Sequence, residues 1–205
     1  MNERIEKLKG HAEILLNAYL GLREKLEVLK PIIFNEPTAR KNSAKRRARG
    51  FLVIRQSLFE SCVLDVHALA FDNDPRTPSV TGFVKALQED PVRALLRNTQ
   101  KRAAVFDKKY ERIIEEWKSF KARSWAQAFR DLRDQRISHL ELKKSGNQYK
   151  RLDVSSLGLK WNDIEESVDL LERLVLDLMG IVRDEGYNLD NIKQALENDG
   201  KAFWA

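Results

Sequence analysis

An unbroken heptad pattern of apolar residues opens the chain and constrains its fold more than any other feature. Steps of three and four predict one long helix with a single buried stripe. The stripe consists of Ile5, Leu8, Ala12, Leu15, Tyr19, Leu22, Leu26, Leu29 and Ile33. Such a stripe packs inside a helical bundle or against a second chain in a coiled coil, and the bundle is the more common outcome.

The remaining segments show the same stepping, which predicts an all-α fold. A second helix is expected over about 39–71 and, because its middle is apolar nearly all round, it should be a central helix. Further helices are expected over about 80–89, from Asp90-Pro91, around 106–120, from Ser124, from Trp161 or Asn162 to about 182, and over 190–203. Residues 143–148 are expected to form a loop, and residues 151–160 are expected to be extended or irregular. With only 9 Gly and 5 Pro in 205 residues, a turn-rich β-sandwich is disfavoured. The sequence predicts one domain over 1–205, an up-and-down helical bundle.

Cysteine content and hydropathy limit the class of protein. Cys62 is the one cysteine in the sequence, so neither an internal disulfide nor a cysteine-based zinc site is expected. The polar start carries no signal-peptide core, and no stretch approaches 18 uninterrupted apolar residues. We therefore expect a cytoplasmic protein that does not enter a membrane.

Charge is distributed unevenly. Residues 153–205 hold 5 Lys and Arg against 12 Asp and Glu, whereas residues 1–152 hold 32 against 19. A basic field attracts polyanions, although a basic run is as often a solvated helix face. Cations at the start of the helix expected over 39–71 would oppose its dipole, which favours a functional reason for them. The candidate nucleic-acid contacts are Lys45, Arg46, Arg47 and Arg49.

Motifs for cofactor or metal chemistry are missing from the sequence. There is no glycine-rich phosphate loop, and none of the histidines has another histidine at i+3 or i+4. We expect neither a metal nor a cofactor.

The unusual stretch is 129–141. The buried stripe of its helix, Trp125, Phe129 and Leu132, continues into Arg136 and His139. Ionisable groups on an inward stripe are costly unless they are paired or functional. In an undistorted helix Arg133 and His139 do not share a face, so either Arg136 is the neighbour of His139, or the helix frays near Ser138, or Arg133 completes a site from another angle.

Arg133-Asp134, four further residues and then His139 resemble the Arg-polar-x(4–6)-His signature of HEPN domains. The sequence Arg-Asp-x-Arg-Ile-Ser-His-Leu-Glu is most similar to that of the HEPN branch linked to phage abortive infection, the AbiU type. A long apolar helix ending at Phe71-Asp72, a short helix after Ser79 and a helix at Trp161 agree with this resemblance. It implies a HEPN-like bundle with extra N- and C-terminal helices.

The same resemblance implies a metal-independent endoribonuclease that works as a homodimer, with RNA as substrate and an antitoxin as a possible protein partner. His139 would take the proton of the RNA 2′-hydroxyl or give one to the leaving 5′-oxygen. Arg133 would hold the scissile phosphate. Arg136, Asp134 and Ser138 are auxiliary candidates, and the products would carry a 2′,3′-cyclic phosphate and a 5′-hydroxyl.

Other interpretations stay open at this point. His139 could be a histidine that the dipole favours at a helix C-terminus. His67 is expected to be a satisfied core histidine, and Asp65 is a candidate partner for an arginine of the motif. The alternative function is a non-catalytic helical module that dimerises or binds a nucleic acid or an acidic partner, through the stripe of Ile5 to Ile33 or the basic run.

Overall fold

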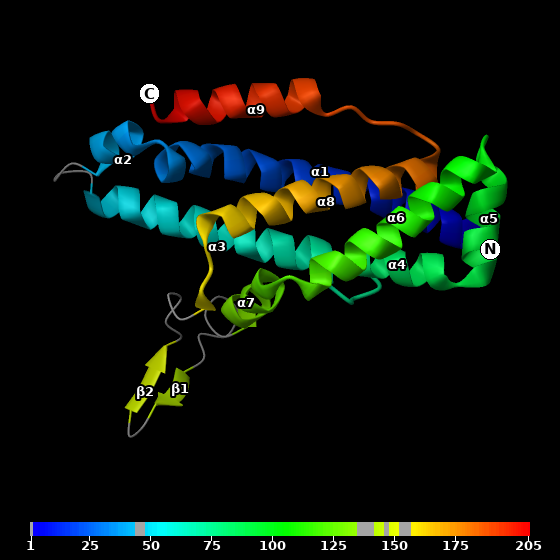
Figure 1. Ribbon diagram of the computed structural model, residues 1–205, viewed down its shortest axis with the longest axis horizontal. Coiled ribbons are helices and arrows are strands. Elements are labelled where there is room, and N and C mark those ends of the chain that lie inside the picture. Colours follow the sequence, from blue (N-terminus) through cyan, green and yellow to red (C-terminus); the bar gives the residue numbers. More distant parts are fainter. Residues whose placement is uncertain (1, 44–47, 135–141, 146–147, 152–156) are drawn as a thin grey trace.

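The computed structural model describes residues 2–43, 48–134, 142–145, 148–151 and 157–205. Within these ranges the chain is an elongated bundle of antiparallel helices, as the sequence predicts (Figure 1). The helices are α1 (Asn2–Phe34), α2 (Glu36–Asn42), α3 (Ala48–Phe71), α4 (Val80–Gln88), α5 (Asp90–Thr99), α6 (Ala103–Ala122), α7 (Ser124–Leu132), α8 (Trp161–Arg183) and α9 (Asp190–Phe203). None of the helices described here has the length and apolar character that a bilayer span needs.

The first helix lies at the centre of the bundle. It packs against α3, α8 and α9, and Figure 1 shows these helices running alongside it. Its predicted stripe is buried from Ile5 to Leu29, and Ile32 takes the buried position at its end while Ile33 is only partly covered. The heptad pattern therefore describes packing within one chain.

Shorter helices close one end of the bundle. Ser79 begins α4 as expected: its hydroxyl accepts a hydrogen bond from the Gly82 amide at 3.0 Å and donates one to the Asp72 carbonyl at 2.6 Å. Helix α6 packs on α8, and α7 packs on both α3 and α6 (Figure 1). This arrangement brings α3, α4, α6 and α7 around one region of the surface.

The helix expected over 39–71 is two helices, so this prediction is wrong in detail. Helix α2 ends at Asn42 with the backbone of Ser43 donating to the Ala39 carbonyl, and α3 begins at Ala48. Arg40 and Lys41 consequently lie in the last turn of α2, where the helix dipole favours cations. The prediction that Arg40 and Lys41 oppose the dipole at the start of a helix is therefore wrong. Arg49, in contrast, does lie in the first turn of α3.

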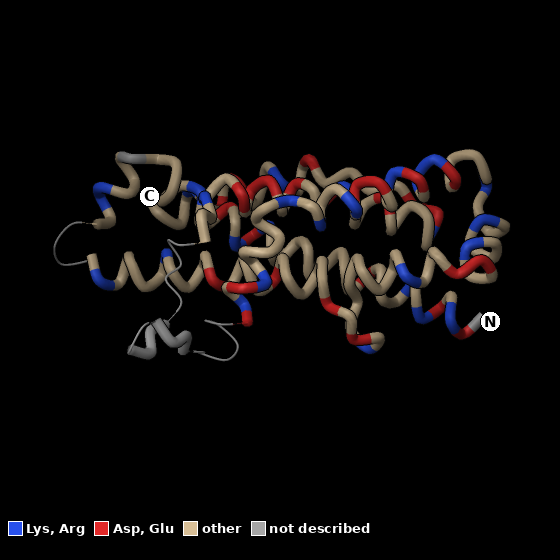
Figure 2. Tube along the Cα trace, turned by 60° about the horizontal axis from the view of Figure 1, so that its bottom comes forward, with Lys and Arg blue, Asp and Glu red and all other residues tan. Residues whose placement is uncertain are grey.

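The start of α3 is also less buried than its sequence predicts. Leu52, Val53 and Ile54 are 49%, 57% and 41% exposed, although Phe51, Cys62, Val63 and Val66 are buried. Figure 2 shows that charged residues are sparse along this helix, the mostly tan stretch at the lower left. An apolar surface is therefore exposed beside Arg49 and Arg55.

A short β-hairpin stands outside the bundle, where the sequence predicts no strand. Strand β1 (Leu142–Ser145) pairs antiparallel with β2 (Gln148–Arg151), with Leu142 opposite Arg151 (Figure 1). The expected loop over 143–148 is thus wrong for the residues of both strands.

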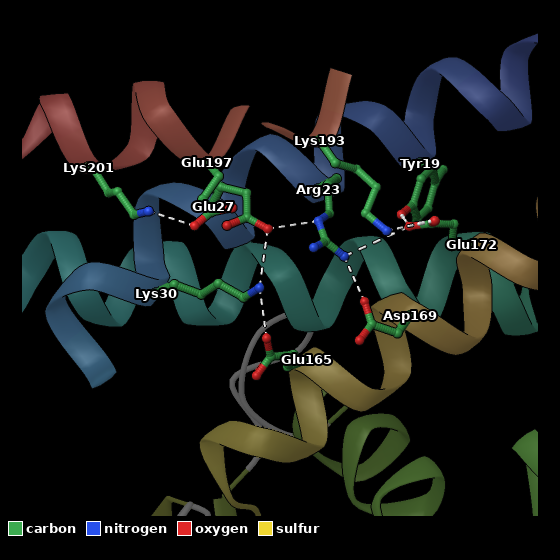
Figure 3. Close-up of polar contacts among 10 residues, drawn as sticks. All are labelled: Tyr19, Arg23, Glu27, Lys30, Glu165, Asp169, Glu172, Lys193, Glu197 and Lys201. Atoms are coloured by element: carbon green, nitrogen blue, oxygen red, sulfur yellow. Dashed lines mark hydrogen bonds and ion pairs between the residues drawn. The ribbon is translucent and has the colours of Figure 1, made fainter. Parts of the chain in front are cut away.

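Charged side chains lock α9 and α8 onto α1. Figure 3 shows Arg23 of α1 at the centre, with its Nη1 atom 2.7 Å from Asp169 Oδ1 and its Nε atom 2.8 Å from Glu27 Oε1. Tyr19 donates a 2.5 Å hydrogen bond to Glu172, which also accepts one from Lys193 at 2.9 Å. Asp169 and Glu172 of α8 therefore connect α8 to Arg23 and Tyr19 of α1 and to Lys193 of α9.

Candidate functional site

Helix α7 is fixed by an aromatic cluster, and this sets the direction of the arginines that follow. Trp125, Phe129 and Leu132 are buried as their stripe predicts. The Trp125 ring makes an edge contact with Phe120 of α6 at 4.8 Å, and Phe120 lies 5.6 Å from Phe71 of α3. Because these rings anchor one face of α7, its next turn meets the end of α3.

A cavity of ≈ 860 Å³ lies at this meeting point. We call it the α3–α7 cavity. It is lined by residues of α3, α4, α6 and α7, by residues that directly follow α3, and by Arg133 after α7. The chemically active side chains in its wall are Asp65, His67, Asp72, Lys85, Lys118, Lys121, Arg130 and Arg133.

Positive charge dominates this cavity. Lys85, Lys118, Lys121, Arg130 and Arg133 face two carboxylates, and both carboxylates are engaged elsewhere. Asp65 forms a 2.6 Å ion pair with Lys25 of α1 and not with Arg133, the arginine of the motif that the structure describes, so Lys25 takes the place of the candidate partner. Asp72 accepts hydrogen bonds from Thr77 and from the Asp74 amide and so holds the turn after α3. The surplus of cations makes the cavity suitable for an anionic group.

Arg130 is the cation best placed for such a group. Its guanidinium carbon lies 5.2 Å from the centroid of the Phe71 ring, which fixes the side chain by a cation–π contact. It forms no ion pair with any residue in the described ranges, and its buried Nε atom has no hydrogen-bond partner there. A half-buried guanidinium without a carboxylate partner is unusual, because its desolvation is uncompensated.

Arg133 of the motif lines the same cavity, directly after the last residue of α7. Its Nη1 atom lies 2.5 Å from Oδ1 of Asp134, and both side chains remain partly exposed. The structure therefore brings Arg133 and Asp134 together, in the arrangement that an orienting carboxylate requires.

His67 is not the satisfied core histidine that the sequence suggests. Its side chain is half-buried in the wall of the α3–α7 cavity, and its ring is tilted against Phe71 at 5.7 Å. Burial, followed by the positive charge of Arg133, lowers the pKa of its imidazole, while Asp134 and Asp72 oppose that shift. These effects together favour the neutral form of the ring over the charged form.

Several residues singled out in the sequence lie outside the described residues. They are Lys45, Arg46, Arg47, Arg136, Ser138 and His139. Helix α7 ends at Leu132, and the predicted helical-wheel relation between Arg133 and His139 falls on a stretch outside the described residues. Arg49 is described and exposed, but it does not line the α3–α7 cavity.

Sequence reasoning missed Arg130 and the two lysines of α6. Arg130 lies three residues before Arg133, one helical turn away, and this spacing is a signal that was available. Lys118 and Lys121 carried no comparable signal, because only the packing of α6 on α7 brings them to the cavity. No three His, Cys, Asp or Glu side chains gather into a metal-binding group within the described ranges.

Comparisons with known proteins agree with the motif and the helical architecture. No curated protein matches the chain, and no solved structure does. The family model of AbiU2, a HEPN family, matches residues 5–203 and so covers nearly the whole sequence. A match of this extent, on an all-α bundle that carries Arg133-Asp134 at the end of α7, shows that the chain belongs to the AbiU2 family of HEPN domains.

Proposed function

We propose that this protein is a metal-independent endoribonuclease that cuts RNA in the cytoplasm, in phage defence or a toxin–antitoxin-like system. Arg133 and His139 are its catalytic residues, and Asp134, Arg136 and Ser138 assist them. The observation that carries the proposal is the position of Arg133: the arginine of the family motif lines a cavity in which cations outnumber carboxylates.

RNA supplies its own nucleophile, so the protein needs only to move protons and to stabilise charge. A guanidinium matches the geometry of a phosphate and stabilises the charge that develops on its oxygens. Asp134, 2.5 Å from Arg133, orients that guanidinium. His139 transfers a proton, and the products carry a 2′,3′-cyclic phosphate and a 5′-hydroxyl.

We further propose that the active form is a homodimer, as the family resemblance implies. The exposed apolar residues Leu52, Val53 and Ile54 of α3 form a surface against which a second copy of the chain packs. Light scattering of the wild-type protein and of a Val53→Glu variant tests this: a dimer that becomes a folded monomer supports the assignment of the trio, and an unchanged mass rejects it.

Cleavage is tested with end-labelled RNA in the presence of EDTA. Wild-type protein should cut the RNA and leave intact a DNA of the same sequence, because DNA lacks the 2′-hydroxyl. Arg133→Ala and His139→Ala should abolish cutting while His11→Ala, on α1, should not. Equal cutting by the His139→Ala and wild-type proteins would refute the proposal.

The alternative is a non-catalytic binding module, and one observation favours a version of it. The stripe of α1 is buried within the chain, so it is not available for an intermolecular coiled coil. The exposed trio on α3 beside Arg49 and Arg55 remains a candidate surface for a partner. This alternative predicts no cleavage, and salt-sensitive RNA binding that weakens when Lys45, Arg46, Arg47 and Arg49 are changed to glutamate.

A further inference from the structure

Two aromatic rings position three nitrogen-bearing side chains in the α3–α7 cavity. The rings are those of Phe71, at the end of α3, and Trp117 of α6, whose centroids lie 5.7 Å apart. The His67 ring lies 5.7 Å from the Phe71 ring, and the guanidinium carbon of Arg130 lies 5.2 Å from it. The ammonium nitrogen of Lys121 lies 5.3 Å from the centroid of Trp117. All five side chains line the cavity, so an imidazole, a guanidinium and an ammonium group surround one part of it.

These nitrogen groups lack partners in the part of the chain that the structure describes. Neither Arg130 nor Lys121 forms an ion pair there, and the buried Nε atom of Arg130 has no hydrogen-bond partner. His67 forms no hydrogen bond with a described residue. Both carboxylates of the cavity wall are held by other side chains. An anion that enters the cavity therefore meets donors whose desolvation nothing else compensates.

The opening of the cavity suits a polymer of phosphates. Lys85, Lys118 and Lys121 are exposed, so the cavity opens to solvent on the side of α4 and α6. A guanidinium beside an ammonium group matches the charge and the oxygen atoms of a phosphate. RNA can place one phosphate there while the rest of the strand stays in solvent. This inference rests on the proposed function for the choice of RNA as the source of the phosphate, but it does not require the RNA to be cut.

His67 is the group in this cavity whose charge responds to an anion. Arg130 and Arg133 face it from α7 and from the residue after α7. Burial and Arg133 lower the pKa of the imidazole, while Asp134 and Asp72 oppose that shift. A phosphate bound beside the ring adds negative charge and raises the pKa again, because a nearby opposite charge favours the protonated form.

Lysines reach the same cavity from the other two helices, Lys85 from α4 and Lys118 and Lys121 from α6. They add positive charge in the absence of a ligand, and a bound phosphate offsets it. The protonated form of His67 is therefore disfavoured in the free protein and favoured in the complex.

We propose that the α3–α7 cavity binds one phosphate of the RNA backbone, which Arg130 and Lys121 hold and to which His67 donates a hydrogen bond after taking up a proton from solvent. This phosphate is a second one, beside the scissile phosphate assigned to Arg133. The residues of the site all belong to one protomer, so each copy in a homodimer carries a complete site. Because binding takes up a proton, the affinity for RNA rises as the pH falls from the pKa of the bound ring to that of the free ring, and it levels off outside this window.

The proton uptake is tested with 2′-O-methyl RNA, which keeps the phosphates of RNA but lacks the 2′-hydroxyl. Fluorescence anisotropy at constant salt, between about pH 8 and pH 5, gives the affinity at each pH. The affinity of the wild type should rise by up to about tenfold per pH unit inside the window, and His67→Gln should lack this rise. His11→Gln is the matched control and should follow the wild type, because His11 lines a different cavity.

The difference between the curves isolates His67, since the other histidines titrate in both proteins and a phosphodiester does not titrate in this range. Thermal melts at each pH show whether the variants are folded, and His67→Asn replaces His67→Gln if the glutamine variant unfolds. A variant curve parallel to that of the wild type overturns the proposal.

The cation of α6 is tested by a pair of substitutions on that helix. Lys121→Gln should lower the slope of log affinity against log salt by about 0.7, as the loss of one phosphate contact on a single strand does. Lys108→Gln removes the same charge from an exposed position of α6 outside the cavity and should leave the slope unchanged. Equal slopes in the two variants overturn the contact with Lys121.

Nuclear magnetic resonance of the wild-type protein distinguishes RNA from free phosphate. The imidazole signal of His67 is identified by its loss in the His67→Gln spectrum, and its pH titration is repeated with 2′-O-methyl RNA and with inorganic phosphate. RNA should raise the pKa of this ring at phosphate concentrations at which the inorganic ion has no effect. If inorganic phosphate acts alone, or as readily as RNA, the cavity is a site for a free anion and the RNA assignment is overturned. If neither acts, the whole proposal is overturned.

The proposed ribonuclease and the phosphate site can fail separately. A wild type that binds RNA with proton uptake at His67 but does not cut unmodified RNA rejects the ribonuclease and leaves the phosphate site. A wild type that cuts RNA, with no effect of His67→Gln on the pH dependence of binding, rejects the phosphate site and leaves the ribonuclease.

Discussion

The guanidinium of Arg130 lies over the ring of Phe71, with 5.2 Å between the guanidinium carbon and the ring centroid. The contact joins the end of α7 to the end of α3 and points a cation without a described carboxylate partner into the α3–α7 cavity. A guanidinium held in this way is available to an anionic group that enters the cavity.

Arg130→Gln is therefore expected to weaken RNA binding by the same factor for every RNA sequence, because a phosphate contact does not read the bases. Loss of one phosphate contact should lower the slope of log affinity against log salt by about 0.7 for a single strand. Fluorescence anisotropy in a KCl series, with both proteins carrying His139→Ala to prevent cutting, measures this slope. Arg123→Gln is the matched control, because Arg123 pairs with Glu166 outside the cavity. An unchanged slope for Arg130→Gln would exclude a phosphate contact.

Some features around the α3–α7 cavity follow from the sequence and others do not. The stripe of Trp125, Phe129 and Leu132 follows from periodicity, and the cap at Ser79 follows from residue type, because both signals are local. The position of His67 is not local. Its exposure depends on how α6 and α7 pack against α3, and a lone histidine on an apolar helix carries no sign of that packing.

Two errors of the sequence analysis have the same cause. The apolar run at Leu52, Val53 and Ile54 predicts burial on every side of α3, but only neighbouring helices can provide it, and none covers these residues in the described structure. Likewise, the sequence suggests an arginine of the motif as a candidate partner for Asp65. Its partner is Lys25, forty residues earlier on α1, and helix packing alone selects it.

Gly200 is predicted to be essential for the docking of α9. A β-carbon at this position would lie 2.2 Å from the carbonyl oxygen of Glu27 on α1, so the two helices must separate to accept Gly200→Ala. We expect a loss of about 1–3 kcal/mol in the free energy of unfolding. Gly21→Ala is the control, because nothing lies within 4 Å of its β-carbon position in α1, and it should stabilise the helix. Urea unfolding of the two variants measures both effects, and equal midpoints would contradict the close packing.

Arg23 is expected to be the most sensitive member of the network in Figure 3. It is 7% exposed, and Glu27, its partner at 2.8 Å, is 3% exposed. Arg23→Met should cost about 3 kcal/mol, because it leaves a buried carboxylate with only Lys30 beside it, at 3.2 Å. The control is Arg183→Met, which removes an ion pair with the exposed Glu13 and should change the unfolding midpoint far less. Similar losses in the two variants would show that the burial of Arg23 has no energetic consequence.

Acid should loosen the same network through Glu172. Burial acts to raise the pKa of this carboxyl, but hydrogen bonds from Tyr19 and Lys193 outweigh it and leave the pKa below its ordinary value of 4.5. A depressed pKa in the folded state stabilises the protein above the ordinary value, and this stabilisation is lost as the pH falls through the folded value. The free energy of unfolding of the wild type should therefore drop below pH 4.5, and Glu172→Gln, already less stable at pH 7, should show a shallower drop. Urea unfolding at a series of pH values compares the two proteins. Because other carboxyls titrate equally in both, the difference between the curves isolates Glu172, and parallel curves would rule out its contribution.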